Sequence, residues 1–362
     1  MARALMLAHR GIALTHPNPM VGALLVRDDQ IVAEGFHTFD GRKHAEIIAL
    51  EHAAGAARGA TLYVNLEPCC HTNRTGPCTK AIINAGVKRV VIAMKDPNPR
   101  VAGRGIRELR RAGLEVAVGV HQAEAQRLNE PFARWVMSGL PLVTMKSALT
   151  LDGQIAAPNG TVTWITSPAS RQEVQRLRHA SDGLLTGIGT VLADDPRMTD
   201  RTGLPRRRRL LRIISDSKLR IPMDSKLVQS AKQNDVLVFT ARSANTKKVR
   251  ALENSGVEVI QLRPRSGHVD LRQVIRELGR RDILSVILEA GSALNGAMLD
   301  AGLVDKVVLF YAPKFLGTVT APVARHRPKN IGTIHPLENL TLRRFGPDFA
   351  VEGYFRDVYR NH

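Results

Sequence analysis

The chain has 362 residues, a formal net charge of +19 and 44% hydrophobic residues. A chain of this length indicates two or three domains, and its hydrophobic content excludes disorder across the whole chain. No apolar run reaches the roughly 18 residues that a membrane helix needs, and the first ten residues lack the pattern of a signal peptide. We therefore expect a cytoplasmic protein with no membrane partner.

The positive charge leaves three interpretations open. An excess of 52 Lys and Arg over 33 Asp and Glu is typical of a nucleic-acid binder. It is equally typical of an enzyme whose field attracts phosphorylated small molecules, or of a basic surface without any partner. The cysteines are more informative, because Cys69, Cys70 and Cys78 lie within ten residues of one another. Such a cluster is no disulfide framework, and it indicates a reducing compartment and a metal or catalytic role.

Apolar periodicity in the first part of the chain predicts alternating strands and helices. We expect strands at residues 20–27, 30–37, 60–66, 88–94 and 114–118 and helices at residues 44–57, 77–85, 101–112 and 122–136. Asp28-Asp29 separates the first two strands and is a hairpin signal. This alternation predicts a three-layer α/β domain.

Turn residues at 138–141 mark the end of the first domain. We place the boundary near residue 142, which gives domains at 1–142 and 143–362. In the second domain we expect a helix at residues 168–179, with Ser167 as its N-cap and Pro168 at its first position, and strands at residues 142–149, 183–186, 210–215, 236–240, 257–261, 283–289 and 306–311. Further helices are expected between the later strands, so this is a second α/β domain. The basic run Arg206–Arg209 reads as a loop whose role the sequence does not explain.

Three short motifs in the first domain match the H-x-E…P-C…C signature of zinc deaminases. His44-Ala45-Glu46 begins a predicted helix, Pro68-Cys69 follows a predicted strand, and Pro77-Cys78 begins the next helix. The ligands would be His44, Cys69 and Cys78, which leave the fourth tetrahedral position open for water. Zinc lowers the pKa of that water to about 7. Glu46 can then take its proton and deliver it to the ring nitrogen and the leaving amine.

Each of these motifs also has a purely structural interpretation. A His-x-Glu pair on a helix is common at protein surfaces, and two cysteines nine positions apart can be buried core thiols. The joint pattern, with Pro before both cysteines, favours the metal site. Cys70 has no place in the signature, and we interpret it as a packing residue.

Eight residues separate Cys69 from Cys78, whereas nucleic-acid deaminases carry P-C-x-x-C. With the runs 16–22 (HPNPMVG), 66–78 (LEPCCHTNRTGPC) and 96–105 (DPNPRVAGRG), the pattern resembles the bifunctional deaminase/reductase family of riboflavin biosynthesis. The resemblance spans nearly the whole chain. It departs from the family pattern at Cys70, where Ser is common, and at Gly76, where Pro is common; neither is a ligand position.

This resemblance implies a cytidine-deaminase-like α/β/α domain followed by an α/β domain similar to dihydrofolate reductase. The first domain would use one Zn²⁺ to deaminate a diaminopyrimidinone that carries a ribosylamine 5-phosphate, with Glu46 as the proton shuttle. Asn18 is a candidate ligand for the pyrimidine, although an Asn-Pro turn explains it equally well. His71 and Arg74 are candidate phosphate or ring contacts, or part of a solvated loop.

The second domain would reduce the ribosyl group to a ribityl chain with NADPH. By itself, its Gly-rich turn at residues 291–297 predicts either a phosphate cradle or plain helix capping, and G-x-G-x-x-G is absent. By resemblance, the residues that bind the cofactor would be Ala148, Trp164, Thr190, Asp194, Ser217, Gly291, Ser292, Ala293, Leu294, Asn295, Gly296 and Ala297. Those that face the substrate would be Lys146, Arg178, Met198, Arg201 and Glu289. Lys146 and Asp194 are candidates to support proton transfer, and Trp164 has the alternative of a core aromatic.

Two further functions stay open at this point. A nucleic-acid deaminase with an appended binding domain would explain the charge, but the low aromatic content of 4% and the cysteine spacing argue against it. A non-catalytic zinc scaffold would have no need of Glu46. We therefore expect a phosphorylated pyrimidine as the partner rather than a nucleic acid, and we leave open whether the chain forms a homo-oligomer.

Overall fold

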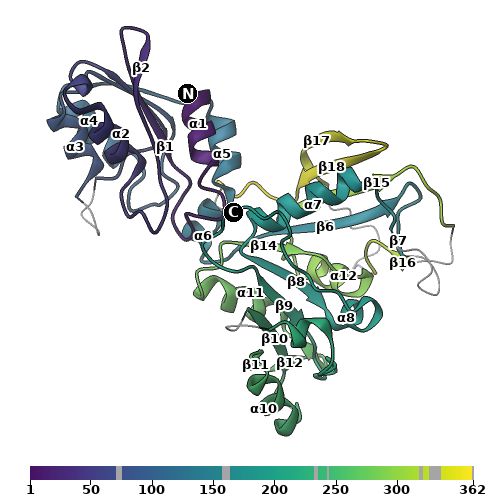
Figure 1. Cartoon of the computed structure of the whole chain (residues 1–362). Helices are drawn as coiled ribbons and strands as arrows, with labels where there is room; N and C mark the ends of the chain where they lie inside the picture. The colour runs from purple at the N-terminus through teal and green to yellow at the C-terminus, as the bar shows by residue number, and fades with distance from the viewer. Residues whose placement is uncertain are drawn as a thin grey trace. The chain divides into compact units, whose positions relative to one another are not determined.

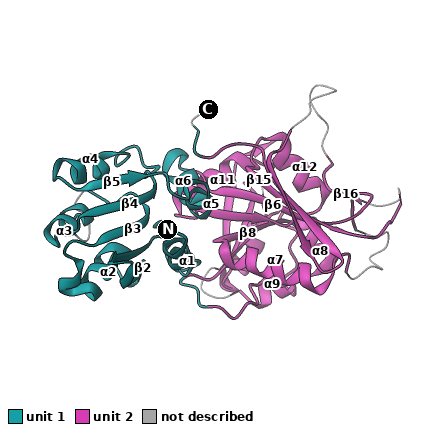
Figure 2. Cartoon of the chain, turned by 90° about the horizontal axis from the view of Figure 1, so that it is seen from above, with its two compact units in different colours: residues 1–139, 205–207, 359–362 teal, residues 140–204, 208–358 magenta. Residues whose placement is uncertain are grey.

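The computed structural model describes residues 1–70, 76–156, 164–231, 235–242, 244–317, 321–325 and 336–360. They form two compact units (Figure 2). Unit 1 consists of Met1–Gly139 and Pro205–Arg207, together with the chain end from Tyr359. Unit 2 consists of Leu140–Leu204 and Arg208–Val358. Among the described residues, no helix has the length and apolar character needed to cross a membrane.

Unit 1 contains a five-stranded sheet in the order β2-β1-β3-β4-β5. Its strands are β1 (Gly22–Arg27), β2 (Gln30–Phe36), β3 (Thr61–Leu66), β4 (Arg89–Met94) and β5 (Glu115–Val118). β1 runs antiparallel to both β2 and β3, whereas β3, β4 and β5 are parallel. The β1–β2 hairpin turns at Asp28 and Asp29, both with positive φ, as the sequence predicts.

Helices cover both faces of this sheet and make the expected three layers (Figure 1). They are α1 (Ala2–His9), α2 (Ala45–Ala53), the 3₁₀ turn η1 (Ala54–Ala57), α3 (Cys78–Asn84), α4 (Arg104–Arg111), α5 (Gln122–Leu128) and α6 (Glu130–Ser138). α2, α3 and α4 pack on one face around Leu25, Leu62 and Ile82, which are fully buried. α1 and α5 cover the other face.

One expectation for unit 1 is wrong, and one helix was missed. The single helix predicted at residues 122–136 is two helices, α5 and α6, because Asn129 leaves the helical conformation and exchanges hydrogen bonds with the backbone of Met20. Pro131, at the beginning of α6, reinforces the break. Helix α1 was not predicted, since eight residues with three buried side chains give only a weak periodic signal.

Unit 2 is built on a nine-stranded sheet in the order β11-β10-β9-β8-β14-β6-β15-β18-β17. Seven neighbouring strands from β11 to β15 are parallel, and β18 and β17 are antiparallel additions at one edge. These strands are β6 (Leu142–Thr150), β8 (Gly183–Gly187), β9 (Leu211–Ser215), β10 (Val236–Ala241), β11 (Glu258–Leu262), β14 (Ser285–Leu288), β15 (Lys306–Ala312), β17 (Glu338–Phe345) and β18 (Asp348–Tyr354). Two short strand pairs lie outside it, β7 (Gln154–Ala156) with β16 (Ala321–Pro322) and β12 (Pro264–Arg265) with β13 (His268–Val269).

The helices of unit 2 connect the parallel strands and bury two apolar clusters against the sheet. They are α7 (Pro168–Ala180), α8 (Ile188–Asp194), α9 (Lys226–Gln229), α10 (Thr246–Asn254), α11 (Leu271–Arg280) and α12 (Ser292–Asp300). α7 begins as predicted, with the Ser167 hydroxyl accepting from the backbone N–H of Ser170. α8 was not predicted. The β17–β18 hairpin was not predicted either, because β17 is largely exposed and lacks a continuous apolar face.

Candidate active site

The three predicted metal ligands come together in unit 1. His44 is the N-cap residue of α2, Cys69 follows the end of β3, and Cys78 is the first residue of α3. His44 Nδ1 lies 3.1 Å from Cys78 Sγ and 3.5 Å from Cys69 Sγ. All three donor atoms lie within 4.8 Å of one another. Helix starts and a strand end thus bring residues far apart in sequence to one point.

This donor set fits a tetrahedral zinc ion. Ligands at about 2.0–2.3 Å from a tetrahedral zinc ion stand roughly 3.5 Å apart, close to the 3.1 and 3.5 Å between His44 Nδ1 and the two Sγ atoms. A hydrogen bond from the Cys78 thiol lowers the pKa of Cys69, and the same bond together with burial raises the pKa of Cys78. The backbone N–H of Cys78 also donates to Cys69 Sγ. These contacts favour the thiolate of Cys69, and a bound divalent cation would displace the remaining thiol proton.

Glu46 is buried in the first turn of α2, two residues beyond His44, and only 4% of it is exposed. Burial raises the pKa of its carboxyl, while the nearby His44 opposes that rise. A carboxyl with a raised pKa beside a metal-ligand set is able both to accept and to return a proton near neutral pH. The role of Glu46 as the proton shuttle stays a prediction, and this position is compatible with it.

A histidine that was not predicted, His37, links Asn18 to the metal ligand His44. Asn18 Nδ2 is 2.9 Å from His37 Nε2, and His37 Nδ1 is 2.9 Å from the carbonyl oxygen of Lys43. Because Nδ1 faces an acceptor, it donates, and Nε2 accepts from Asn18. The rings of His37 and His44 meet edge to face at 5.6 Å. His37 thereby orients the Asn18 amide, and its only sequence signal was a lone histidine at the end of a predicted strand.

A buried carboxylate holds the strand end that carries Cys69. Glu67 accepts hydrogen bonds from the backbone N–H groups of Asp96, Gly103 and Ile106. These bonds fix the start of α4 against residues 67–69, where a Cβ on Gly105 would lie 2.1 Å from the carbonyl oxygen of Pro68. Burial raises the pKa of the neighbouring Asp96 to about 6. The resemblance to a known family included these runs, but nothing in the sequence indicated that Glu67 joins them.

The remaining predictions for this site differ in outcome. Cys70 is a partly buried free thiol outside the ligand set, and burial raises its pKa. His71 and Arg74 lie outside the described residues.

In unit 2, three of the predicted substrate residues form one buried ion cluster. Arg178 of α7 donates to both carboxylate oxygens of Glu289, at 2.7 and 3.0 Å, and Lys146 of β6 approaches Glu289 at 3.4 Å. All three side chains are at most 14% exposed. Burial raises the pKa of Glu289, but the two cations outweigh that effect and hold it at about 2. The cluster has one negative and two positive charges, which suits an anionic substrate.

The loop at residues 198–201 is attached to this cluster. Arg178 Nη1 donates to the carbonyl oxygen of Thr199 at 3.1 Å. A buried pair next to it, His179 Nδ1 and Asp200 Oδ2 at 2.8 Å, was not predicted and fastens the same loop to α7. Within the loop, Met198 is buried, whereas Arg201 is exposed.

The predicted cofactor turn is a strand-to-helix turn, as expected. It follows β14, and Gly291 is the N-cap of α12 without any side-chain capping bond. α8, at the end of the neighbouring strand β8, has the same kind of N-terminus at Gly187. The two turns lie side by side, because Cβ atoms built on Gly187 and Gly291 would stand 3.5 Å from Leu294 and 3.9 Å from Thr190.

These two helix N-termini fit the phosphates of a dinucleotide, since free N–H groups and helix dipoles favour anions. Two buried oxygens at this edge of the sheet, Thr186 Oγ1 and Asn295 Oδ1, have no hydrogen-bond partner among the residues that the structure describes, which is consistent with a bound group that supplies one. Asn295 Nδ2 donates to the carbonyl oxygens of Ala290 and Val323 and so holds the turn. Ser292 donates to the carbonyl oxygen of Pro322.

Among the described residues, no side-chain hydrogen bond or ion pair joins the other predicted cofactor residues to these turns. Ala148 is partly buried in β6, Asp194 is exposed at the end of α8, and Ser217 Oγ accepts from the N–H of Val269. Trp164 is 59% exposed, so it is not a core aromatic. The guanidinium carbon of Arg171 lies 4.7 Å from the centre of its ring.

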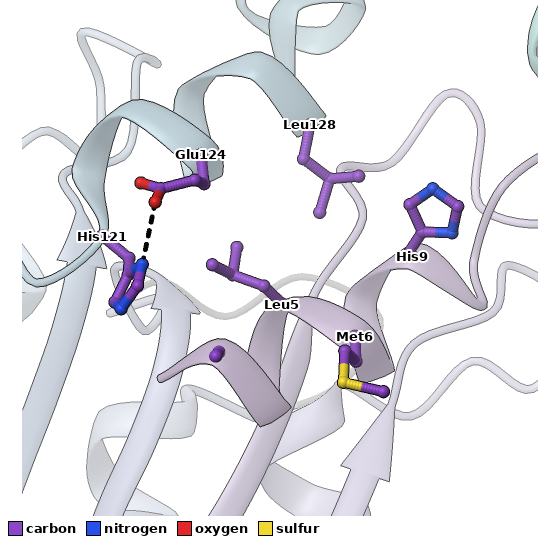
Figure 3. A pocket seen from close by; sticks show the side chains of 7 residues that line it. Leu5, Met6, His9, His121, Glu124 and Leu128 are labelled. Carbon is purple, nitrogen blue, oxygen red and sulfur yellow. Dashed lines mark hydrogen bonds and ion pairs between the residues drawn. The ribbon is translucent and has the colours of Figure 1, made fainter. Parts of the chain in front are cut away.

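One further hollow of about 560 Å³ lies in unit 1 between α1 and α5 (Figure 3). His121 and Glu124 meet across 2.9 Å at one wall. Its lining consists of Ala2, Leu5, Met6, His9, His121, Glu124 and Leu128. None of these is a predicted site residue, and the hollow shares no residue with the metal cluster.

Comparison with known proteins agrees with both halves of this description. Residues 1–94 match the cytidine and deoxycytidylate deaminase zinc-binding region, and residues 141–351 match the RibD C-terminal domain. The chain is 43% identical to the riboflavin biosynthesis protein RibD of Escherichia coli, covering 97% of each chain. It is 42% identical to RibD of Actinobacillus pleuropneumoniae, covering 97% of this chain and 93% of that one. The chain belongs to the RibD family.

Solved structures of RibD proteins have the same fold. Acinetobacter baumannii RibD superposes with a TM-score of 0.85 at 35% identity, covering 98% of this chain and 97% of that one. The Thermotoga maritima diaminohydroxyphosphoribosylaminopyrimidine deaminase/5-amino-6-(5-phosphoribosylamino)uracil reductase gives a TM-score of 0.84 at 36% identity, covering 98% and 97%. The fold class is therefore confirmed: a cytidine-deaminase-like domain precedes a reductase domain of the RibD type.

As a member of this family, the chain is a bifunctional zinc-dependent deaminase and NADPH-dependent reductase of riboflavin biosynthesis. The relatives are enzymes that act on small molecules, so the alternative function, a nucleic-acid deaminase, has no support.

Proposed function

We propose that unit 1 hydrolyses the 2-amino group of 2,5-diamino-6-(5-phosphoribosylamino)pyrimidin-4(3H)-one, and that unit 2 then reduces the ribosyl group of the product to a ribityl chain. The observation that carries this proposal is the cluster of His44, Cys69 and Cys78 with the buried Glu46 next to it. A phosphorylated pyrimidine as substrate also accounts for a net charge of +19, because both units would take an anion. We propose the cytoplasm as its location, because cysteines outside disulfide bonds persist in a reducing compartment.

In the deamination, His44, Cys69 and Cys78 would hold zinc. Bound zinc lowers the pKa of a water molecule to near 7 and so supplies a nucleophile at neutral pH. The Glu46 carboxylate accepts a proton from the attacking water, holds it because burial raises its pKa, and donates it to the pyrimidine ring nitrogen. It then accepts the second proton of the same water, from the hydroxyl on the tetrahedral carbon, and delivers it to the leaving amine, which departs as ammonia. Asn18, held by His37, offers its carbonyl oxygen and its second N–H to the pyrimidine edge.

In the reduction, the turns at residues 187–190 and 291–297 would hold the phosphates of NADPH, which supplies the hydride. Arg178 and Lys146 carry the excess positive charge that orients the phosphosugar, and Glu289 fixes both cations in place. Arg201 and Met198 lie on the loop that Arg178 fastens and would complete the substrate side. Trp164, Ala148, Ser217 and Asp194 keep their proposed places at the cofactor.

The decisive assay supplies purified protein with the diaminopyrimidinone ribosylamine phosphate and NADPH, and follows ammonia release and NADPH oxidation separately. We expect both signals from one polypeptide. Ammonia release without NADPH oxidation would confine the proposal to unit 1, and the absence of both signals would refute it.

Substitution of Glu46 by Gln tests the proton shuttle. We expect the deamination rate to fall by a factor of at least about 10², with zinc content and reduction of supplied intermediate unchanged. Glu51→Gln is the matched control, because Glu51 lies on the same helix, is about half exposed and pairs with Lys43. Deamination by Glu46→Gln at a rate near that of Glu51→Gln would show that Glu46 is not the shuttle.

A further inference from the structure

Two arginines of the unexplained basic run, Arg206 and Arg207, belong to the deaminase unit. Pro205–Arg207 is part of unit 1, although these residues follow more than sixty residues of unit 2 in sequence. The segment joins unit 1 through the backbone N–H of Arg207, which donates to the carbonyl oxygen of Ala13 at 2.9 Å. Arg209, two residues later, instead faces Asp235 in unit 2 at 3.9 Å.

The side chain of Arg207 connects two loops of unit 1. Its Nη1 donates to the carbonyl oxygen of His16 at 2.9 Å, and its guanidinium lies 3.5 Å from the centre of the Phe39 ring. Its Nε approaches Asp40 at 3.2 Å. The side chain is only 18% exposed, so these contacts are largely shielded from water.

Both loops lead directly to the deaminase site. The first continues from His16 to Asn18, whose backbone N–H donates to the carbonyl oxygen of Thr15. The second leaves β2 at His37 and reaches the metal ligand His44, with His37 bonded to Lys43 on the way. Arg207 therefore contacts each loop two residues away from the Asn18–His37 hydrogen bond, at His16 in the first loop and at Phe39 in the second.

The contacts of Arg207 differ in strength. Asp40 is 77% exposed, and an ion pair with so exposed a partner adds little. The bond from a charged donor to the His16 carbonyl and the stacking on Phe39 are shielded, and they need the planar guanidinium. The contacts with His16 and Phe39, rather than the ion pair with Asp40, therefore hold the two loops together.

We propose that Arg207 is a positioning residue of the deaminase: it holds the two loops together so that Asn18 meets the pyrimidine in the correct orientation. This inference rests on the proposed function of Asn18. Arg207 lies outside residues 1–94, which match the deaminase region. The deaminase thus depends on a residue that its own motifs do not include.

The test is steady-state deamination by the full chain carrying Arg207→Gln. We expect KM to rise roughly fivefold to tenfold and kcat to change less than about twofold, because ground-state binding through Asn18 is weakened while Glu46 is untouched. Arg207→Lys should rescue only part of the loss, since a lysine keeps the charge but not the planar fork. Zinc content and the kinetics of reduction of supplied intermediate should stay at wild-type values.

Two controls separate this role from charge and from general stability. Arg209→Gln removes the same charge from the same run, and Asp40→Asn removes only the exposed pair; both should leave KM within about twofold of wild type. A KM for Arg207→Gln equal to that of Arg209→Gln would overturn the proposal. So would a fall in kcat with KM unchanged.

The double variant Asn18→Ala/Arg207→Gln identifies the route of the effect. If Arg207 acts through Asn18, the double variant has the KM of Asn18→Ala alone. Multiplying effects would refute positioning through Asn18 and indicate a direct contact of Arg207 with the substrate. An unchanged KM in Asn18→Ala alone would instead refute the proposed role of Asn18, so the two failures are distinguishable.

Discussion

Replacement of Glu289 by Gln tests whether the ion cluster of unit 2 stabilises the fold as its geometry indicates. The substitution keeps the shape of the side chain and removes the charge that lies between Arg178 and Lys146. Two buried cations then lose their shared partner. We expect a large loss of stability, because breaking a buried ion pair on one side leaves uncompensated charge.

The magnitude follows from the pKa of Glu289. The cluster lowers that pKa from 4.5 to about 2, and a shift of about 2.5 units corresponds to roughly 3 kcal/mol in the free energy of unfolding. Because the folded-state pKa is the lower one, this contribution is complete above about pH 5 and is lost as the pH falls towards 2. The difference between wild type and Glu289→Gln should therefore be constant from pH 8 to 6 and shrink by about 1 kcal/mol on going to pH 4.

The assay is urea unfolding followed by tryptophan fluorescence. The chain has two tryptophans, Trp135 in unit 1 and Trp164 in unit 2. A Trp135→Phe background thus makes the signal report unit 2 alone, which matters because a two-unit chain does not unfold as a single two-state system. Glu253→Gln, on the exposed side of α10, is the matched control and should change stability by less than about 0.5 kcal/mol.

Two results would refute this reasoning. A loss below about 1 kcal/mol for Glu289→Gln at pH 7 would mean that the desolvation of the cluster cancels its attraction. A loss that stays the same between pH 7 and pH 4 would mean that the substitution acts through packing rather than through charge.

Three further predictions concern unit 1. Removal of zinc by a chelator should abolish deamination and leave reduction of supplied intermediate intact, and loss of both activities would contradict separate sites. Gly105→Ala should cost at least about 2 kcal/mol and weaken zinc binding measured by competition, because its Cβ would lie 2.1 Å from the Pro68 oxygen next to Cys69; unchanged zinc affinity would contradict this. Leu62→Ala, at a fully buried position, should lower the free energy of unfolding by about 2.5–5 kcal/mol. Ile31→Ala, at a residue 53% exposed, is its control and should stay within about 0.5 kcal/mol.

Strongly periodic elements were predictable from the sequence, and weak ones were not. Each predicted strand of unit 1 overlaps an observed one within a few residues, because its apolar run is bounded by turn residues. The break at Asn129 was not foreseen, because its cause is a pair of hydrogen bonds to Met20, more than a hundred residues away. The exposed strand β17 was missed for a related reason, since its pairing with β18 rather than its composition makes it a strand.

The metal site was the most predictable part of the function. His44, Glu46, Cys69 and Cys78 stand at element ends that local sequence signals mark, and the chemistry of zinc requires these residue types. His37 was not predictable, because a lone histidine carries no signal until a partner such as Asn18 is seen next to it.

The sequence by itself determined the two α/β halves, the zinc-deaminase signature and the family to which the chain belongs. Only the tertiary structure decided that Glu289 joins Arg178 and Lys146, that Glu67 fixes the start of α4, and that Arg207 belongs to the deaminase unit. The physical reason is the separation of the contacting residues along the sequence. Helix starts, turns and metal-ligand motifs are encoded within a few neighbouring residues, whereas these contacts join residues 36 to 194 positions apart, which meet only when the sheets are assembled.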